Sequence, residues 1–334
     1  MKLLIIGGTG FLSSTLMEES LGAGHDVTIV TRGRRTQIVA PIVRQIIADR
    51  SDTTAFRAAL QGQSYDAVLD AICFTPEQAQ QDIDCFAGYV GRLVMISTDF
   101  VYSVGPHPVP IPEEALRDAP TEYGRNKAAA EDILLGAKDV LPSTALRPPH
   151  IVGPGGLLGT GSLQGRDPAL PARLRRGEPI VLLDSGTLLI QPADRRDIAH
   201  ACLAVLTAPH TIGKAYNIAG PKAVPTRRYY EILAQALGVP LAVASLPSDV
   251  YLRAFPNNAS FARHRAYSLE ALARDAAFRP DISLETSLQE TLAWLDTNPP
   301  DGADAPLSPR DAEVLTLLKN CDTRVLEILA STSP

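Results

Sequence analysis

Short runs of apolar residues alternate with longer amphipathic segments through residues 1–150 of the chain. Apolar runs of four or five residues, rich in Val, Ile and Leu, indicate strands that are buried on both faces. They predict strands over residues 3–6, 27–30, 43–47, 67–71, 92–96 and 143–146. The segments between them predict helices from about residue 11 to 22 and over about 52–61, 76–86 and 121–137. Strands separated by helices pair in parallel through crossovers, so the pattern predicts an α/β fold with a doubly wound parallel sheet.

The pattern changes after Pro148 and Pro149, where a glycine-rich stretch covers residues 153–161. Shorter elements are expected beyond it, among them a helix over about 195–207 and a strand over 215–219. We therefore expect a smaller domain in the later chain that shapes a cleft for a ligand.

These patterns predict three regions. The first domain is expected over residues 1–147 plus about 190–220, the smaller C-terminal domain over 148–189 and 221–297, and a linker with a final helix over 298–334. The final helix is amphipathic over 309–329. Its apolar face is consistent with covering the cleft, docking on the core or binding a partner helix.

A glycine cluster separates the first predicted strand from the first predicted helix. Gly7, Gly8 and Gly10 permit a tight turn and let backbone N–H groups approach a phosphate, while the helix N-terminus carries a partial positive charge. The strand predicted before these glycines and the helix predicted after them favour a site for a dinucleotide pyrophosphate over an ordinary turn. Ser13 stands where a third small glycine is usual, and a serine is small enough for the same helix–strand packing.

The bulk properties exclude several classes of function. The formal net charge is −6 and the pI about 5.6, which does not favour nucleic-acid binding. No apolar run is long enough to span a membrane, and the N-terminus does not resemble a signal peptide. The cysteines (Cys73, Cys85, Cys202 and Cys321) and the six histidines lack metal-ligand spacing, so we expect no metal site. Apolar surroundings of two of these thiols indicate a reducing compartment, and we expect a cytoplasmic protein.

The end of the second predicted strand bears on which dinucleotide binds. An NAD site usually places a carboxylate there to bind the ribose 2′-hydroxyl, but this chain has Thr31 followed by three arginines. Guanidinium groups suit a 2′-phosphate, so we expect NADP(H) to be held by Arg32 and by Arg34 or Arg35, unless these form a solvated basic turn. Asp49 is expected either to bind the adenine amino group or to help Asp52 cap the next helix.

Two further segments carry the residues of an acid–base site. Ser97 and Thr98 end the fifth predicted strand, where ligands of such sheets lie. Tyr123 and Lys127 lie four residues apart near the start of a helix and so share one face. A neighbouring ammonium and a cofactor cation would lower the tyrosine pKa from about 10 toward neutrality, which allows proton exchange.

Together these motifs resemble those of extended or atypical short-chain dehydrogenases/reductases, the NAD-dependent epimerase/dehydratase family, over about residues 1–297. The resemblance implies a Rossmann-type sheet, with Tyr123 as acid/base, Lys127 lowering its pKa and Thr98 donating to the substrate oxygen; Asp99 is added as a catalytic candidate. The resemblance and the spacing together give these expected cofactor-binding residues: Gly7, Gly8, Thr9, Gly10, Phe11, Leu12, Arg32, Arg35, Asp49, Arg50, Ala71, Ile72, Ser97, Tyr123, Lys127 and Pro149.

The resemblance also narrows the reaction. Sugar-nucleotide dehydratases have a glutamate base where this chain has Phe100, so dehydration is not expected. Deoxysugar ketone reductases carry an aromatic residue there, and expected NADP(H) use favours net reduction of a sugar or sugar-like ketone. The segment from Asp70 to Phe74 departs from the usual ending of that strand, which leaves the substrate open. Alternatives are an epimerase with retained NAD, a nucleotide-sensing regulator and an RNA-associated protein; a homodimer is the expected assembly.

Overall fold

The computed structural model describes residues 1–34, 42–160 and 165–331, which form two compact units. Unit 1 consists of residues 1–151, 191–221 and 266–283. Unit 2 consists of residues 152–190, 222–265 and 284–334. Each unit has its own buried apolar clusters, and the two are described separately.

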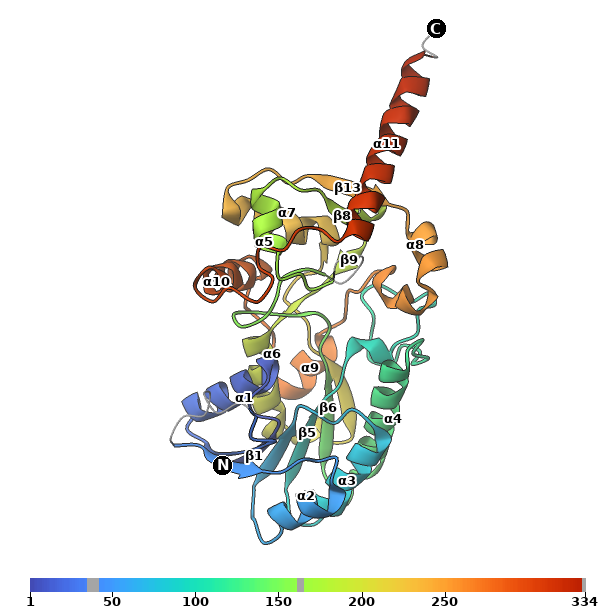
Figure 1. Ribbon diagram of the computed structural model, residues 1–334. Helices are drawn as coiled ribbons and strands as arrows, with labels where there is room; N and C mark the ends of the chain where they lie inside the picture. The colour runs from blue at the N-terminus through green and yellow to red at the C-terminus, as the bar shows by residue number, and fades with distance from the viewer. Residues whose placement is uncertain (35–41, 161–164, 332–334) are drawn as a thin grey trace. The chain divides into compact units, whose positions relative to one another are not determined.

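A seven-stranded sheet in the order β11-β6-β5-β4-β1-β2-β3 forms the centre of unit 1 (Figure 1). Its strands are β1 (Lys2–Ile6), β2 (Asp26–Thr31), β3 (Arg44–Ile47), β4 (Ala67–Asp70), β5 (Arg92–Ile96), β6 (Ser143–Arg147) and β11 (Lys214–Asn217). Every pairing is parallel, with Ile6 opposite Val30 on one side and Asp70 on the other. The predicted doubly wound α/β sheet is confirmed, and all seven carboxyl ends meet at one edge.

Helices cover both faces of this sheet. One face carries α1 (Phe11–Gly22), α6 (Arg195–Leu206) and α9 (Glu270–Ala276), and the other carries α2 (Thr53–Leu60), α3 (Pro76–Phe86) and α4 (Glu122–Gly136). Successive β1 residues point to opposite faces, so Ile5 packs with the first group and Leu4 with the second. The short elements of this unit are η1 (Asp99–Val101), β10 (Ala193–Asp194) and η3 (Pro209–Thr211), and β7 (Ile151–Val152) lies at the unit boundary.

Unit 2 is built from short strand pairs and helices around a separate apolar cluster. β8 (Ile180–Leu183) pairs in parallel with β13 (Val243–Leu246), and β9 (Leu189–Ile190) pairs antiparallel with β12 (Val224–Pro225). The remaining elements are α5 (Leu170–Arg175), η2 (Asp184–Gly186), α7 (Thr226–Leu237), α8 (Ser248–Ala254), η4 (Pro256–Phe261), α10 (Leu284–Thr297) and α11 (Pro309–Ser331). The predicted final helix therefore forms, and its first half contacts β13.

Residues 266–283 differ from the expected division, because they belong to unit 1 and not to the C-terminal domain. Side-chain contacts explain the difference: Leu272 enters the apolar cluster of the sheet, and Asp275 accepts hydrogen bonds from Lys214 and Tyr216 of β11. This segment therefore brings late residues to the same sheet that carries the glycine-rich turn. Among the described residues, no helix is long and apolar enough to cross a membrane.

Candidate active site

The glycine-rich turn joins β1 to α1 as predicted, and the fold requires its glycines. Gly8 has a φ of +69°, and a Cβ there would lie 2.6 Å from Cβ of Ile29 on β2. The turn is closed by Ser13, whose hydroxyl accepts a hydrogen bond of 2.8 Å from the backbone N–H of Gly10. Serine at this position therefore stabilises the turn besides being small enough to pack.

A cavity of about 670 Å³ opens beside this turn within unit 1. It is lined by the expected cofactor residues Gly7, Thr9, Gly10, Arg32, Asp49, Arg50 and Ile72. Arg34, one of the two alternatives expected beside Arg32, also lines it, together with residues that were not predicted to bind cofactor: Ile6, Ser13, Val30, Thr31, Ala48, Ser51, Phe56, Phe74 and Gln78. Because its lining joins the ends of β1, β2, β3 and β4, the cavity lies where parallel sheets of this kind bind nucleotides.

Asp49 and Asp52, whose roles the sequence left open, have different contacts in the structure. The carboxylate of Asp52 caps α2 by accepting from the backbone N–H of Ala55 at 2.9 Å. Asp49 faces the cavity; hydrogen bonds from Ser51 and the nearby positive charges of Arg32 and Arg34 lower its pKa. A carboxylate and two guanidinium groups therefore meet at one end of the cavity. Arg35, the other expected phosphate ligand, lies outside the described residues.

Arg50 lines the cavity, but its guanidinium group is turned into a buried cluster below it. It donates to Asp70 at 2.6 Å, to Asp82 at 2.8 Å and to Gln81 at 3.2 Å. Asp70 also accepts from the backbone N–H of Ile72 at 2.7 Å, so the cluster fixes the loop that follows β4. Arg50 thus stabilises the cavity wall through ion pairs that the sequence pattern does not predict.

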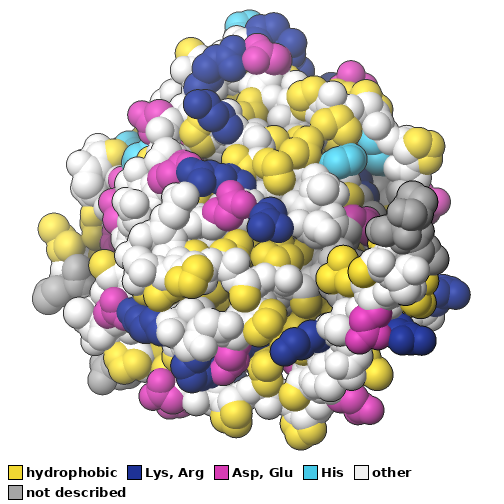
Figure 2. Space-filling model, turned by 90° about the horizontal axis from the view of Figure 1, so that it is seen from above, with side chains coloured by type: hydrophobic (Ala, Val, Ile, Leu, Met, Phe, Trp, Pro, Cys, Tyr) yellow, Lys and Arg dark blue, Asp and Glu magenta, His cyan; other side chains and the backbone are white. Residues whose placement is uncertain are grey.

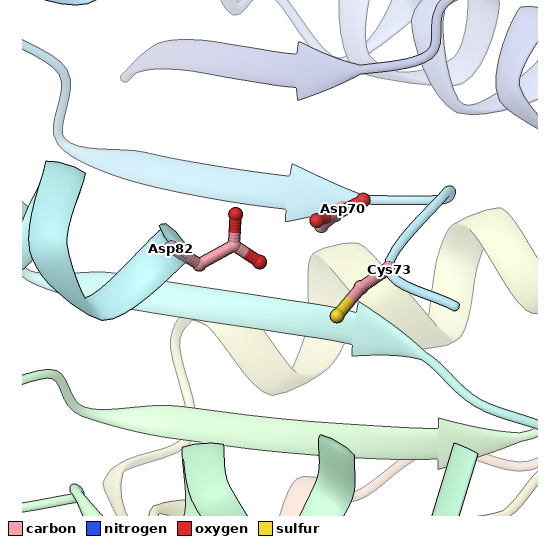
Figure 3. A group of neighbouring side chains, drawn as sticks. All are labelled: Asp70, Cys73 and Asp82. Carbon is pink, nitrogen blue, oxygen red and sulfur yellow. The ribbon is translucent and has the colours of Figure 1, made fainter. Parts of the chain in front are cut away.

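Asp70, Cys73 and Asp82 form a compact group of side chains, drawn in Figure 3, with ligand atoms within 4.8 Å of one another. The group does not fit a metal site, because Arg50 supplies the cation that binds both carboxylates. Burial opposes ionisation of both acids, yet Arg50 lowers the pKa of Asp70, while burial and the neighbouring Asp70 raise that of Asp82 well above its usual value. The surroundings therefore favour the charged form of Asp70 beside Arg50 and oppose the charged form of Asp82.

Helix α4 carries Tyr123 and Lys127 against the end of β5. Its N-cap is Thr121, which accepts from the N–H of Gly124 at 3.1 Å. A Cβ on Gly124 would overlap the carbonyl oxygen of Phe100, so a glycine there lets the helix approach the segment after β5. The sequence therefore places the helix start beside the Ser97–Thr98 strand end.

Tyr123 and Lys127 lie one turn apart but in different surroundings. The Tyr123 residue is 45% exposed and lies beside Thr98; partial burial of its hydroxyl raises the pKa of Tyr123, and the neighbouring Thr98 offsets part of that rise. The Lys127 ammonium is buried and donates to the carbonyl oxygens of Cys73 and Ile96. Burial lowers the pKa of Lys127. The expected lowering of the tyrosine pKa includes the effect of a cofactor cation and remains a prediction; in the protein alone, burial raises the pKa of Tyr123.

The other predicted residues of the strand end have defined positions. The Ser97 hydroxyl is buried without a hydrogen-bond partner among the described residues, which fits a polar group supplied by a ligand. The Asp99 carboxylate is 1% exposed and accepts from the hydroxyl of Tyr267 at 2.6 Å. Sequence analysis did not identify Tyr267, since it follows Asp99 by 168 residues.

Besides Gly8, Ser97, Tyr123 and Lys127, which are described above, four further expected cofactor residues lie outside the cavity lining. Leu12 packs against the apolar cluster below α1, and the ring of Phe11 lies 5.6 Å below the Arg195 guanidinium. The backbone N–H of Ala71 donates to Ile6, which continues the sheet ladder past β4, and Pro149 is buried after β6. Their predicted contacts with a cofactor remain predictions.

The site's geometry agrees with comparisons to known proteins. Residues 3–219 match the family described as "NAD dependent epimerase/dehydratase family". A 2-alkyl-3-oxoalkanoate reductase of Stenotrophomonas maltophilia is 28% identical, over 88% of this chain and 99% of its own. A 2′-dehydrokanamycin reductase of Streptomyces kanamyceticus is 27% identical, over 75% and 70%. The solved UDP-glucose 4-epimerase of Thermotoga maritima has the same fold, with a TM-score of 0.72 and 16% identity over 89% of this chain and 99% of that one.

Proposed function

Because the chain belongs to the NAD-dependent epimerase/dehydratase family, for which NAD(P) is the typical cofactor, we propose that it is an NADP(H)-dependent reductase of a ketone on a sugar or sugar-like substrate. The observation that carries this proposal is the position of the Tyr123 side chain beside Thr98 at the carboxyl end of β5. Two hydroxyl groups directed at one point can bind one carbonyl oxygen. The half-exposed phenol of Tyr123 leaves this point accessible to a substrate.

The residues of unit 1 fit a dinucleotide. The required glycines, the helix N-terminus of α1 and the cavity beside them suit a pyrophosphate and an adenosine. The unpartnered hydroxyl of Ser97 leaves one buried donor for a ligand near the strand end. A bound nicotinamide supplies or accepts the hydride in this chemistry.

In the proposed reduction, the side chains move one proton to the oxygen of the substrate. Thr98 donates a hydrogen bond to the carbonyl oxygen and so polarises it. The phenol of Tyr123 donates its proton to the same oxygen as the carbonyl carbon is reduced. Lys127, held by two backbone carbonyls one turn along α4, places a positive charge that stabilises the phenolate left behind.

NADP(H) is preferred in this proposal because of the charges at the end of β2. Arg32 and Arg34 line the cavity, and the strand ends at Thr31, without a carboxylate to bind a 2′-hydroxyl. A 2′-phosphate placed there would gain charge-assisted hydrogen bonds. A 2′-hydroxyl would gain little from the same groups.

We favour net reduction over epimerisation for two reasons: the names of the relatives, and the aromatic side chain of Phe100 beside Tyr123. The two relatives compared above, which match over most of this chain, are named as reductases, whereas a UDP-glucose 4-epimerase of Lactobacillus helveticus is 26% identical over 46% of this chain. The ring of Phe100 packs edge-on against Tyr123, with centroids 6.2 Å apart, where a dehydratase would need a base. A role in RNA binding has less support, since basic and acidic side chains are interspersed across the face shown in Figure 2.

Consumption of NADPH, followed at 340 nm with a panel of ketosugars and 3-oxo acids, tests the proposal. We expect net oxidation of NADPH with at least one ketone, and loss of turnover by about a hundredfold or more in Tyr123→Phe with the affinity for NADPH retained. Two results would contradict the proposal: NAD that co-purifies and interconverts substrates without net oxidation, or unchanged turnover in Tyr123→Phe.

A further inference from the structure

A buried chain of polar groups extends from the Thr98 hydroxyl into the interior of unit 1. Thr98 Oγ1 lies 3.4 Å from Asp99 Oδ1, and the hydroxyl of Tyr267 donates to Asp99 Oδ2 at 2.6 Å. The Tyr123 side chain lies beside Thr98, whose Oγ1 also accepts a hydrogen bond from the backbone N–H of Phe100 at 3.2 Å. Four residues therefore follow one another in the order Tyr123, Thr98, Asp99 and Tyr267. Three of them are nearly inaccessible, with exposures of 6% for Thr98, 1% for Asp99 and 3% for Tyr267.

Tyr267 is held firmly enough to direct its hydroxyl. Its backbone N–H donates to the side-chain oxygen of Gln191 at 2.7 Å, and the Gln191 amide donates to the carbonyl oxygen of Gly220 at 2.7 Å. Its ring stacks on Tyr102, with centroids 6.1 Å apart and planes 25° apart. A phenol fixed at the backbone and along its ring has one orientation for its O–H group.

The number of protons available to these four side chains sets the direction of the hydrogen bonds between them. A carboxylate accepts only, and Thr98 has one hydroxyl proton. When Thr98 donates that proton to Asp99, its oxygen accepts from the phenol of Tyr123. When it donates to a substrate carbonyl, Asp99 keeps the hydrogen bond from Tyr267 and stays satisfied. The second donor therefore lets Thr98 turn toward a substrate without leaving a buried carboxylate unbonded.

We propose that Tyr267 is a positioning residue for the reaction: by binding Asp99 it orients the Thr98 hydroxyl at Tyr123 and weakens the negative field of Asp99 there. The inference rests on the proposed function, and it changes the role expected for Asp99. A buried carboxylate bonded on both oxygens is a positioning residue that acts through Thr98. The charge of Asp99 raises the pKa of Tyr123, and the Tyr267 donor limits that effect.

Other charged groups pack near these four side chains, so a test must use variants that leave those groups unchanged. Lys127 approaches from α4 with its ammonium on backbone carbonyls. On the far side of the Tyr267 ring, Tyr102 bonds to Arg147, which is paired with Glu131 and also bonds to the backbone of Glu113. None of these groups changes in Tyr267→Phe or Asp99→Asn.

Titration of Tyr123 tests the proposal without a substrate. Full-length protein with tyrosine labelled at ¹³Cζ and saturated with NADP⁺ is titrated by NMR, and the Tyr123 signal is assigned by its loss in Tyr123→Phe. We expect Tyr267→Phe to raise the pKa of Tyr123 by roughly 0.5–1 unit, a threefold to tenfold change in proton affinity, because Asp99 loses a donor. Asp99→Asn removes the charge and is expected to lower that pKa.

Tyr102→Phe is the matched control, since it also removes a buried hydroxyl beside Tyr267 but one bonded to Asn217 and Arg147. An unmoved Tyr123 titration in Tyr267→Phe, or an equal shift in Tyr102→Phe, overturns the proposal. If Tyr267→Phe does not fold, an unmoved titration in Asp99→Asn overturns it as well. If the wild-type protein oxidises no NADPH with any ketone, the proposed function is wrong. The titration of Tyr123 still tests whether Tyr267 acts on it through Asp99 and Thr98.

Discussion

At the scale of single residues, we expect the arginines that follow β2 to determine which dinucleotide is preferred. Arg34 lines the cavity and acts on Asp49, and its removal takes away a charged donor to a 2′-phosphate. We predict that Arg34→Ala weakens NADPH binding by about tenfold or more, the equivalent of one charge-assisted hydrogen bond, and leaves NADH binding nearly unchanged. Calorimetric titration with both dinucleotides measures the two affinities.

Arg44→Ala is a suitable control for that experiment. Arg44 is an exposed arginine at the start of β3, and it is not part of the cavity lining. It should leave both affinities unchanged. Equal losses of NADH and NADPH affinity in Arg34→Ala would mean that Arg34 supports the cavity wall and does not select the phosphate.

Single residues also show where sequence reasoning reaches its limit. Arg34 and Arg35 were equivalent in the sequence, and only Arg34 falls among the described residues. Asp49 and Asp52 were separated by geometry, because the direction of each carboxylate depends on where α2 begins. Ser13 was predicted to be tolerated for its size, but its hydroxyl also bonds the turn. Side-chain direction follows from local backbone geometry that spacing alone does not specify.

At the scale of elements, the approach of α4 to the end of β5 depends on Gly124. Alanine normally stabilises a helix interior relative to glycine by up to about 1 kcal/mol. At Gly124 a Cβ meets the Phe100 carbonyl oxygen, so we predict that Gly124→Ala lowers the free energy of unfolding by about 1–3 kcal/mol and also reduces turnover, because Tyr123 is displaced. Urea unfolding and NADPH oxidation measure the two effects.

Gly136→Ala provides the control on the same helix. A Cβ on Gly136, the last residue of α4, meets no atom within 4 Å. This variant should keep or slightly raise the stability and leave turnover unchanged. A Gly124→Ala protein as stable as Gly136→Ala would show that α4 can move away from Phe100 at no cost.

The cluster between the β3 and β4 loops gives a prediction with a defined pH dependence. Burial raises the pKa of Asp82, so the folded protein keeps a proton there that the unfolded chain releases. The corresponding stability is fully present below the unfolded aspartate pKa of about 3.9 and is lost as the pH rises through the raised value. Asp82→Asn mimics the neutral acid, and we predict unfolding free energies near the wild type in acid but with less decline at higher pH.

Asp70→Asn has the opposite consequence in the same cluster. Its carboxylate carries the charge that pairs with Arg50 at 2.6 Å, with both side chains nearly buried. Removing one partner of a buried pair costs about 3–5 kcal/mol. Because the pKa of Asp70 is lowered in the folded protein, this stability is present above the unfolded aspartate pKa of about 3.9 and is lost as the pH falls through the folded value, so the variant should be strongly destabilised near neutral pH and less so in strong acid. Chemical unfolding at several pH values distinguishes the two acids. Equal losses in both variants would mean that Asp82 is ionised in the folded protein.

At the scale of the whole molecule, the sequence predicted the strands of the unit 1 sheet but not every segment that packs on it. Apolar runs and intervening helices indicated six of the strands and the parallel pairing, because both follow from periodicity and connection length. The seventh strand, β11, was predicted over 215–219. The segment 266–283 was assigned to the other domain, since its attachment rests on long-range contacts such as that between Asp275 and β11. The same cause hid the contact of Tyr267 with Asp99, and local patterns cannot reveal partners that lie so far apart in the chain.

The final helix gives a prediction about how far the folded core extends. The described side chains from Thr323 to Ser331 are exposed, among them Val325 at 50% and Leu326 at 66%, whereas Val314, Leu315 and Leu318 are partly covered. Removing exposed apolar groups loses almost no burial, so truncation after Asn320 should change the free energy of unfolding by only about 0.5 kcal/mol or less. Truncation after Pro306 also removes the covered residues against β13 and should cost more. Thermal unfolding of both truncated chains, with NADPH titration, measures the difference, and an equal loss in both would mean that the second half of α11 is buried in solution.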